Sequence, residues 1–342
     1  MRKNKARFVN KLYRKIHWII FSKIKPGKWI NNIYSSYRHR KVIPTSQNTD
    51  SVYITQIPNE GAGIGHQISN INSGIHASMV YGVKFAYPGL KNKKWEKFLG
   101  FYLDCDSIAD LKKKGYKVRT LPYFNGDGEK SELIDKIIHS YSDEKVILNL
   151  NLDQFYANQY EVIPFLKSRF EGAEARKDDK LIYDSSCVNI SVHIRRGDIV
   201  SGQTTGDTSL TKRWLDIDYY KNIVQLLTKE LYGRKYKIYI FSEGDAKEYK
   251  TFEQYGPVKY CFDMSAMDSF LHMIRADILI TSKSSFSYKP ALLSDGIRIC
   301  PDGFWHGYPD DEKWIVASSI DGKFDVNKLE DALHHIFYNI KR

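Results

Sequence analysis

The stretch of the chain richest in candidate chemistry is CVNISVHIRRGDIV, residues 187–200. Apolar residues alternate through its first half and predict a strand. Arg195, Arg196, Gly197 and Asp198 follow that strand directly. Paired guanidinium groups suit bidentate capture of phosphate oxygens, the glycine allows close backbone approach, and the aspartate can orient an arginine or accept a proton. The pattern predicts an anion site; the plainer alternative is a strand end with solvated charges.

A glycine-rich turn, GAGIGHQ, occupies residues 61–67 between a predicted strand and a predicted helix. Gly63 and Gly65 would let the backbone approach a phosphate or sugar at the helix N-terminus, with His66 and Gln67 in the first helical turn. The spacing is not G-x-G-x-x-G, so a dinucleotide fingerprint is not indicated. A tight structural turn is the alternative interpretation.

Two later strands also end in polar residues. The strand ending near residue 241 leads into Glu243, and the strand ending near residue 280 leads into a hydroxyl-rich turn containing Ser284, Ser285, Phe286 and Ser287. Backbone N–H groups and serine oxygens at a helix start are suited to phosphate. If the sheet is parallel, the three strand ends converge in one crevice, as a nucleotide diphosphate site requires.

Metal chemistry has little sequence support. Two Asp-x-Asp pairs, Asp104 with Asp106 and Asp216 with Asp218, fit magnesium spacing, but this pattern is common and neither has a nearby histidine. No metal and no other cofactor is expected. The cysteines lack a C-x-x-C pair, which argues against a zinc site and for free thiols in a reducing compartment. These are Cys105, Cys187, Cys261 and Cys300.

The net charge of +12 is confined to one end of the chain. Residues 1–49 hold 13 Lys and Arg and no Asp or Glu, which leaves 39 basic and 40 acidic residues in the remainder. A body-wide basic surface for nucleic acid is therefore not indicated. Within residues 1–25, apolar residues recur at helical spacing among basic ones, a pattern typical of an amphipathic helix on an anionic membrane surface. A basic arm that packs on its own protein or stays disordered is the alternative.

The same arm contains no segment suited to crossing a membrane. Its longest uncharged run, residues 16–22, falls far short of the ~20 residues needed to span a bilayer, and it lacks a small-residue cleavage site. We expect a cytoplasmic protein, peripheral on the inner face of the membrane where the arm binds it.

The order of predicted elements indicates an α/β fold with two Rossmann-like domains facing a cleft. A chain of 342 residues exceeds the usual size of one core. We expect an arm and linker at 1–50, an acceptor-side domain at 51–180 and a nucleotide-sugar domain at 181–342. The charged segment 171–180 is interpreted as a loop-like junction between the two domains.

The motifs together resemble those of the superfamily of α-1,2, α-1,6 and nodulation fucosyltransferases. H-I-R-R-G-D at His193–Asp198 is similar to its H-x-R-R-x-D motif, and G-I-G-H-Q at Gly63–Gln67 to its N-terminal glycine-rich segment. IFSEGD and the segment ending in T-S-K-S-S-F-S at Ser287 resemble its later motifs in the same order. His66 stands where asparagine is usual in the α-1,2 branch, and Tyr288-Lys289-Pro290 replaces a Trp-rich continuation, which indicates a divergent member.

The resemblance implies a GT-B fold and inverting, metal-independent transfer of fucose from GDP-fucose to a glycan. It implies that Arg195 and Arg196 contact the diphosphate, that His193 and Asp198 support the same loop, and that Ser284, Ser285, Phe286 and Ser287 contact the nucleotide. The acceptor expected from the membrane-binding arm is a lipid-linked or surface glycan, such as a polysaccharide precursor.

The chemistry of this transfer needs a cation for the leaving diphosphate and an acceptor for a proton. Arg195 is the first candidate for the cation. Asp198, Asp207 and Glu243 are alternative proton acceptors, as is the departing phosphate itself, and the sequence does not choose among them. Two other functions stay open: a non-catalytic nucleotide- or polyanion-binding module, and a metal-dependent nucleotide-sugar transferase using Asp104 and Asp106.

Overall fold

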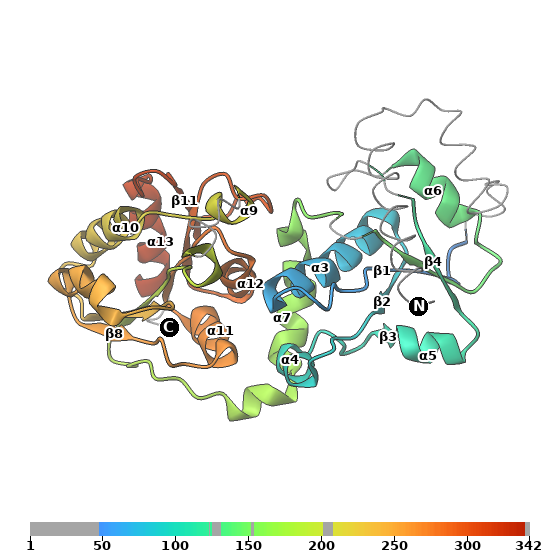
Figure 1. Ribbon diagram of the computed structural model, residues 1–342, viewed down its shortest axis with the longest axis horizontal. Coiled ribbons are helices and arrows are strands. Elements are labelled where there is room, and N and C mark those ends of the chain that lie inside the picture. Colours follow the sequence, from blue (N-terminus) through green and yellow to red (C-terminus); the bar gives the residue numbers. More distant parts are fainter. Residues whose placement is uncertain (1–47, 123, 125–130, 152–153, 201–207, 339–342) are drawn as a thin grey trace. The chain divides into compact units, whose positions relative to one another are not determined.

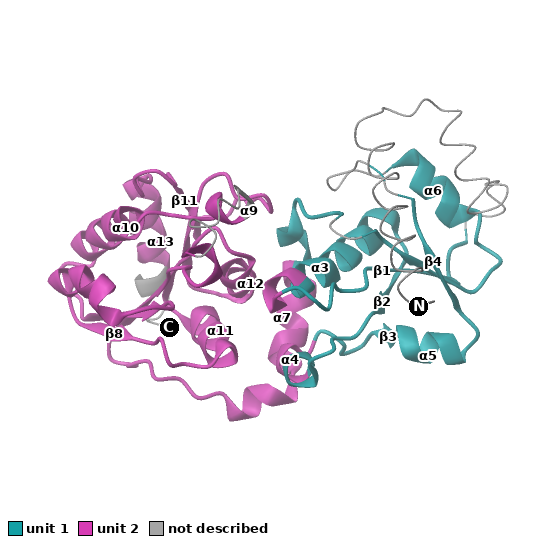
Figure 2. Cartoon of the chain, viewed as in Figure 1, with its two compact units in different colours: residues 1–62, 67–96, 101–162 teal, residues 63–66, 97–100, 163–342 magenta. Residues whose placement is uncertain are grey.

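The computed structural model describes residues 48–338 except 123, 125–130, 152–153 and 201–207 (Figure 1). It divides into two compact units (Figure 2). Unit 1 comprises the described residues of 48–62, 67–96 and 101–162. Unit 2 comprises residues 63–66, 97–100 and the chain from residue 163 onward. Within the described residues, no helix is both long enough and apolar enough to cross a membrane.

Unit 1 is a five-stranded parallel sheet with helices. Its order is β3-β2-β1-β5-β4, so β1 lies in the middle and pairs with β2 and β5. Its elements are β1 (Val52–Thr55), α3 (Ile64–Tyr81), β2 (Lys84–Tyr87), α4 (Lys93–Leu99), β3 (Asp106–Ser107), α5 (Ile108–Lys113), β4 (Lys117–Thr120), α6 (Glu132–His139), β5 (Val146–Asn149) and the 3₁₀ helix η1 (Gln159–Val162).

Unit 2 is a six-stranded sheet, again parallel throughout. Its elements are α7 (Ile163–Gly172), η2 (Glu174–Asp178), β6 (Val188–His193), α9 (Thr208–Thr211), α10 (Ile217–Glu230), β7 (Tyr236–Phe241), η3 (Ala246–Tyr255), β8 (Val258–Tyr260), α11 (Ala266–Arg275), β9 (Ile278–Ile280), α12 (Ser285–Leu293), β10 (Ile297–Pro301), β11 (Trp314–Ala317) and α13 (Val326–Tyr338). The residues of β6 are all buried, because helices cover both faces of the parallel sheet.

The strand order of unit 2 locates its ligand-binding edge. Read from the β8 side, the order β8-β7-β6-β9-β10-β11 corresponds to the 3-2-1-4-5-6 arrangement of dinucleotide-binding sheets. The chain winds outward from β6 to β8, then returns to place β9 on the other side of β6. The switch point therefore lies between β6 and β9, where ligands bind at the carboxyl ends of the strands.

The predicted fold class is confirmed by these two α/β units with parallel sheets. The predicted strands and helices around Val52, Ile190, Ile238 and Ile278 are all present, with ends shifted by a few residues at most. The basic arm of residues 1–25 lies outside the described residues, so its predicted amphipathic helix and membrane contact stay predictions.

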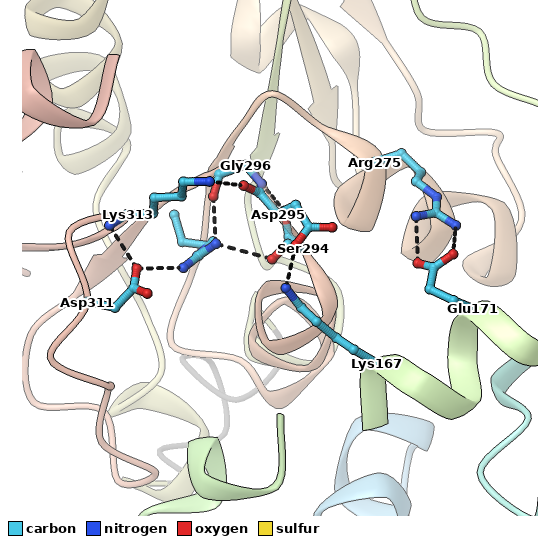
Figure 3. A network of polar contacts seen from close by, with 9 residues as sticks. Lys167, Glu171, Arg275, Ser294, Asp295, Gly296, Asp311 and Lys313 are labelled. Atoms are coloured by element: carbon cyan, nitrogen blue, oxygen red, sulfur yellow. Dashed lines mark hydrogen bonds and ion pairs between the residues drawn. The ribbon is translucent and has the colours of Figure 1, made fainter. Parts of the chain in front are cut away.

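The segment 171–180 differs from the loop that its charges predicted. It contains the end of α7 and the 3₁₀ helix η2, and Glu171, Glu174 and Asp179 form ion pairs. Glu171 accepts two hydrogen bonds from Arg275, at 2.7 and 2.8 Å (Figure 3). Lys167 on α7 donates to Asp295 at 2.6 Å. These ion pairs fix α7 within unit 2, whereas the sequence placed residues 163–180 in the first domain.

Candidate functional site

The three polar strand ends singled out in the sequence belong to adjacent strands. β6 pairs in parallel with β7 on one side and with β9 on the other, and His193 is in register with Phe241. Parallel pairing puts the carboxyl ends of all three strands at the same edge of the sheet. The residues after β6, β7 and β9 therefore lie at one edge of the sheet, whereas the crevice predicted there stays a prediction.

Arg195 lies at the switch point and bridges its two strands. Its Nη1 donates to the Ser284 hydroxyl at 2.9 Å, although the two residues are 89 positions apart. Its Nη2 donates to both carboxylate oxygens of Asp198, at 3.0 and 2.9 Å. Its Nε is buried and has no hydrogen-bond partner among the described residues. A guanidinium held from two sides, with one donor unused, is preorganised for an anion.

The N-terminal end of α12 lies beside Arg195. Ser284 is the N-cap of this helix. Its side chain accepts a hydrogen bond from the Phe286 N–H at 3.2 Å, which stabilises the first turn. The same hydroxyl is the partner of Arg195 Nη1. The cap therefore couples the positive end of a helix dipole to the guanidinium, and both favour a negative charge at this point.

His193, the last residue of β6, is a buried neutral imidazole. Its Nδ1 lies 2.8 Å from the Ser282 hydroxyl, and its ring lies 5.6 Å from the Phe286 ring. Burial, together with the nearby Arg195 charge, lowers the pKa of His193 to about 3. The residue therefore positions the two strand ends and adds no positive charge at neutral pH.

Arg196 has a different environment from its neighbour. Its Nη1 donates to the carbonyls of Arg195 and Leu215, at 3.0 and 3.3 Å. Its guanidinium lies 4.0 Å from the centre of the Trp214 ring, and the side chain is buried. These contacts anchor the loop that follows β6. The two arginines are alike in the sequence, but only Arg195 contacts α12 and the exposed Asp198.

Glu243 lies beside the turn after β6. Gly197 has φ of +57°, and a Cβ at this position would collide with the Glu243 carboxylate. The Ser242 hydroxyl donates to the Ile194 carbonyl at 2.7 Å, and the Tyr249 hydroxyl donates to the Glu243 carbonyl at 3.0 Å. These bonds fix the backbone of Glu243, whereas its side chain is exposed.

The glycine-rich segment Gly63–His66 groups with unit 2. Gly65 lies so close to α12 that a Cβ there would come within 2.8 Å of the Phe286 nitrogen. Only glycine permits this approach of residue 65 to the first turn of α12 within unit 2. Gly63 is exposed and His66 is half-buried, while the Gln67 amide donates to the Ala62 carbonyl at 2.8 Å.

The serines of the α12 turn divide into buried and accessible ones. Ser287 is fully buried and its hydroxyl lies within hydrogen-bond distance of the Ser282 and Ser284 carbonyls. Ser285 and Phe286 are half-buried, and the Ser285 hydroxyl lies 3.4 Å from Nε2 of His306. Ser282 belongs to the motif quoted from the sequence, but its contact with His193 was not predicted. His306 was missed, and no sequence signal indicates it.

Asp106 of the alternative metal pair has hydrogen-bond partners within unit 1. The Asp106 carboxylate accepts from the Tyr53 hydroxyl at 2.7 Å and from Lys114 at 3.3 Å. The pair Asp216 and Asp218 begins α10, where the Asp216 side chain is the N-cap. Among the residues that the structure describes, no group of three or more His, Cys, Asp or Glu is arranged to hold a metal ion.

Comparisons with known proteins give weak structural similarity only. No family model and no curated protein matches the chain. A crystal structure of POFUT1 in complex with GDP-fucose superposes with a TM-score of 0.46 at 13% identity, covering 73% of this chain and 96% of POFUT1. A structure of NodZ α-1,6-fucosyltransferase soaked with GDP-fucose gives a TM-score of 0.38 at 13% identity, covering 76% of this chain and 97% of NodZ.

Proposed function

We propose that this protein is a glycosyltransferase that uses GDP-fucose as its donor. The observation that carries the proposal is the environment of Arg195: a guanidinium at the switch point of a parallel sheet, hydrogen-bonded to the N-cap serine of α12. Such a site suits a nucleoside diphosphate. The choice of GDP-fucose rests on the ordered motifs from Gly63 to Ser287, which resemble those of the fucosyltransferase superfamily.

In the proposed reaction an acceptor hydroxyl attacks the anomeric carbon of fucose. The bond from that carbon to the β-phosphate oxygen breaks, GDP leaves, and the configuration inverts. Negative charge grows on the β-phosphate, where the Arg195 guanidinium and the positive end of the α12 dipole stabilise it. No metal is required in this scheme, because these fixed donors serve the leaving group.

Asp198 is proposed to act by positioning Arg195. Both of its oxygens accept from Nη2, which holds the guanidinium toward Ser284. The proton of the acceptor hydroxyl passes to a carboxylate or to the departing phosphate. Asp207, one of the candidate bases, lies outside the described residues.

A donor screen tests the proposal. The full chain is incubated with GDP-fucose, GDP-mannose and UDP-sugars, and release of the nucleoside diphosphate is measured with and without a mixture of glycan acceptors. We expect turnover with GDP-fucose above all other donors. Tight binding of GDP with no turnover of any donor would favour the non-catalytic binding module instead, and preference for a UDP-sugar would contradict the donor assignment.

The acceptor is proposed to be a surface glycan or lipid-linked precursor made at the inner face of the membrane. The support is the concentration of all excess positive charge in residues 1–49. Each Lys or Arg near anionic lipid contributes roughly 1 kcal/mol to membrane binding. The full chain should sediment with anionic vesicles and dissociate in high salt, whereas a chain lacking residues 1–42 should not bind. Equal binding of both forms would show that the arm is not the anchor.

A further inference from the structure

The strand order of unit 2 indicates toward which neighbouring strand the proposed nucleotide extends from the switch point. Arg195 and Glu243 follow adjacent parallel strands, and the paired residues His193 and Phe241 set their register. Each lies two positions beyond its paired residue, so the two residues occupy equivalent places in the loops that leave neighbouring strands. Arg195 lies at the switch point, and Glu243 lies one strand farther toward β8.

A carboxylate in that position is suited to the ribose of a nucleotide. In sheets of this strand order, phosphates lie at the switch point, and an acidic residue after the second strand accepts hydrogen bonds from the ribose hydroxyls. β7 is the second strand of the arrangement in unit 2. We infer that Glu243 binds the ribose diol of the donor nucleotide and sets its specificity for a ribonucleotide.

The backbone of Glu243 is fixed by hydrogen bonds, whereas its carboxylate is exposed to solvent. The buried Tyr249 side chain and the Ser242 hydroxyl hold the backbone, as described above. The carboxylate lies in space that a side chain at residue 197 would occupy. It has no hydrogen bond or ion pair with any residue that the structure describes. Both oxygens are therefore available to accept from a vicinal diol.

This inference rests on the proposed function, and it changes the role of one residue. The sequence offered Glu243 as a candidate catalytic base. Its place beside the β6 turn, one strand away from the switch point, instead makes it a residue that recognises the nucleoside. A ribose-binding role affects the affinity for GDP itself, whereas a base acts only on the acceptor hydroxyl and affects turnover.

Calorimetric titration of the full chain with GDP and with 2′-deoxy-GDP tests the assignment. A hydrogen bond to a charged acceptor corresponds to about 10- to 100-fold in affinity. We expect the wild-type protein to prefer GDP by that factor, Glu243→Ala to bind both nucleotides with nearly equal, weakened affinity, and Glu243→Gln to lie between. Glu248→Ala removes another exposed carboxylate, five residues along on η3, and should keep the wild-type preference.

The alternative is that the nucleotide extends from the switch point toward β10 instead of β7, and the variant Trp305→Ala tests it. Trp305 follows β10 and is 41% exposed. We expect this variant to keep its affinity for GDP within about twofold. Loss of GDP binding in Trp305→Ala but not in Glu243→Ala would overturn the inference, as would equal binding of GDP and 2′-deoxy-GDP by the wild type. If Glu243→Ala lost turnover with its nucleotide preference intact, Glu243 would be the base. Absence of any GDP binding would reject the proposed function itself.

Discussion

The two units share a parallel architecture and differ in the chemistry at their switch points. In unit 2, the residues after β6 and β9 include the Arg195 guanidinium, the Asp198 carboxylate and the Ser284 cap. In unit 1 the corresponding point lies between β1 and β5, and it is lined by amides. The Gln56 side chain donates to the Asn151 carbonyl at 2.8 Å, and the Asn149 side chain accepts from the Ile57 N–H at 2.9 Å.

The side chains at the two switch points are suited to different ligands. Fixed cations and helix N–H groups stabilise a diphosphate, whose charge a neutral amide edge would match poorly. Neutral amides that both donate and accept suit the hydroxyls of an uncharged glycan. The division between a nucleotide unit and an acceptor unit, proposed from the motifs, stays a prediction.

The largest effect is expected from Arg195→Lys. Lysine keeps the charge but loses the two-sided geometry that joins Ser284 to Asp198. Turnover should fall by roughly 30- to 1000-fold, equivalent to ~2–4 kcal/mol of transition-state stabilisation. The same substitution at Arg275, which pairs with Glu171 on α7, is the control and should leave turnover near that of the wild type. Retention of more than about half the wild-type rate in Arg195→Lys would show that Arg195 is not the phosphate contact.

A smaller effect, specific to one unit, is expected from removing helix caps. Ser284→Ala and Ser107→Ala each delete a capping hydroxyl, in units 2 and 1 respectively. Each should destabilise its helix by about 1 kcal/mol. Only Ser284→Ala also loses the partner of Arg195, so only this variant should weaken GDP binding, by about tenfold. Equal nucleotide affinities in the two variants would remove the functional distinction between the caps.

The buried imidazole of His193 predicts a pH effect on stability. Its pKa is lowered to about 3 in the folded protein, against about 6.5 in an unfolded chain. Protonation therefore favours unfolding, and the stability contribution is lost as the pH falls from about 6.5 toward about 3, at ~1.4 kcal/mol per pH unit. His193→Asn should shift acid unfolding, followed by circular dichroism, to lower pH. An unchanged or higher midpoint would contradict this account.

The smallest effect is expected from chelation. Because Arg195 and the α12 dipole are proposed to stabilise the leaving diphosphate, turnover should be the same within about twofold after treatment with EDTA. Complete loss of activity that manganese or magnesium restores would favour the metal-dependent alternative.

The sequence predicted the parts of the fold that have a strong pattern. Strands such as β6 and β7 are runs of β-branched and aromatic residues and were recognisable. β4 was missed because it lies at the sheet edge, and three of its four residues are exposed. β3 has only two residues and carries no periodicity. Short polar edge strands form because a neighbour provides hydrogen bonds, which the local sequence does not reveal.

The sequence indicated which residue types could form a site, but it did not indicate the tertiary hydrogen-bond partners of those residues. Arg195 and Arg196 cannot be separated from the sequence alone, since their difference depends on Trp214, Leu215 and Ser284. The strand order that makes β6 and β9 neighbours brings together residues 89 positions apart. Tertiary pairing of this kind depends on the whole sheet, and the local pattern carries no record of it.

Hydrogen exchange of the full chain with and without GDP is the most direct test of the central claim, that the switch point of unit 2 binds the nucleotide. Protection should appear in three segments of unit 2, residues 194–199, 242–244 and 282–287, which follow β6, β7 and β9. The amide-lined residues 56–59 and 149–151 of unit 1 should exchange as in the free protein. Protection limited to unit 1, or no protection at the ends of β6 and β9, would contradict the account.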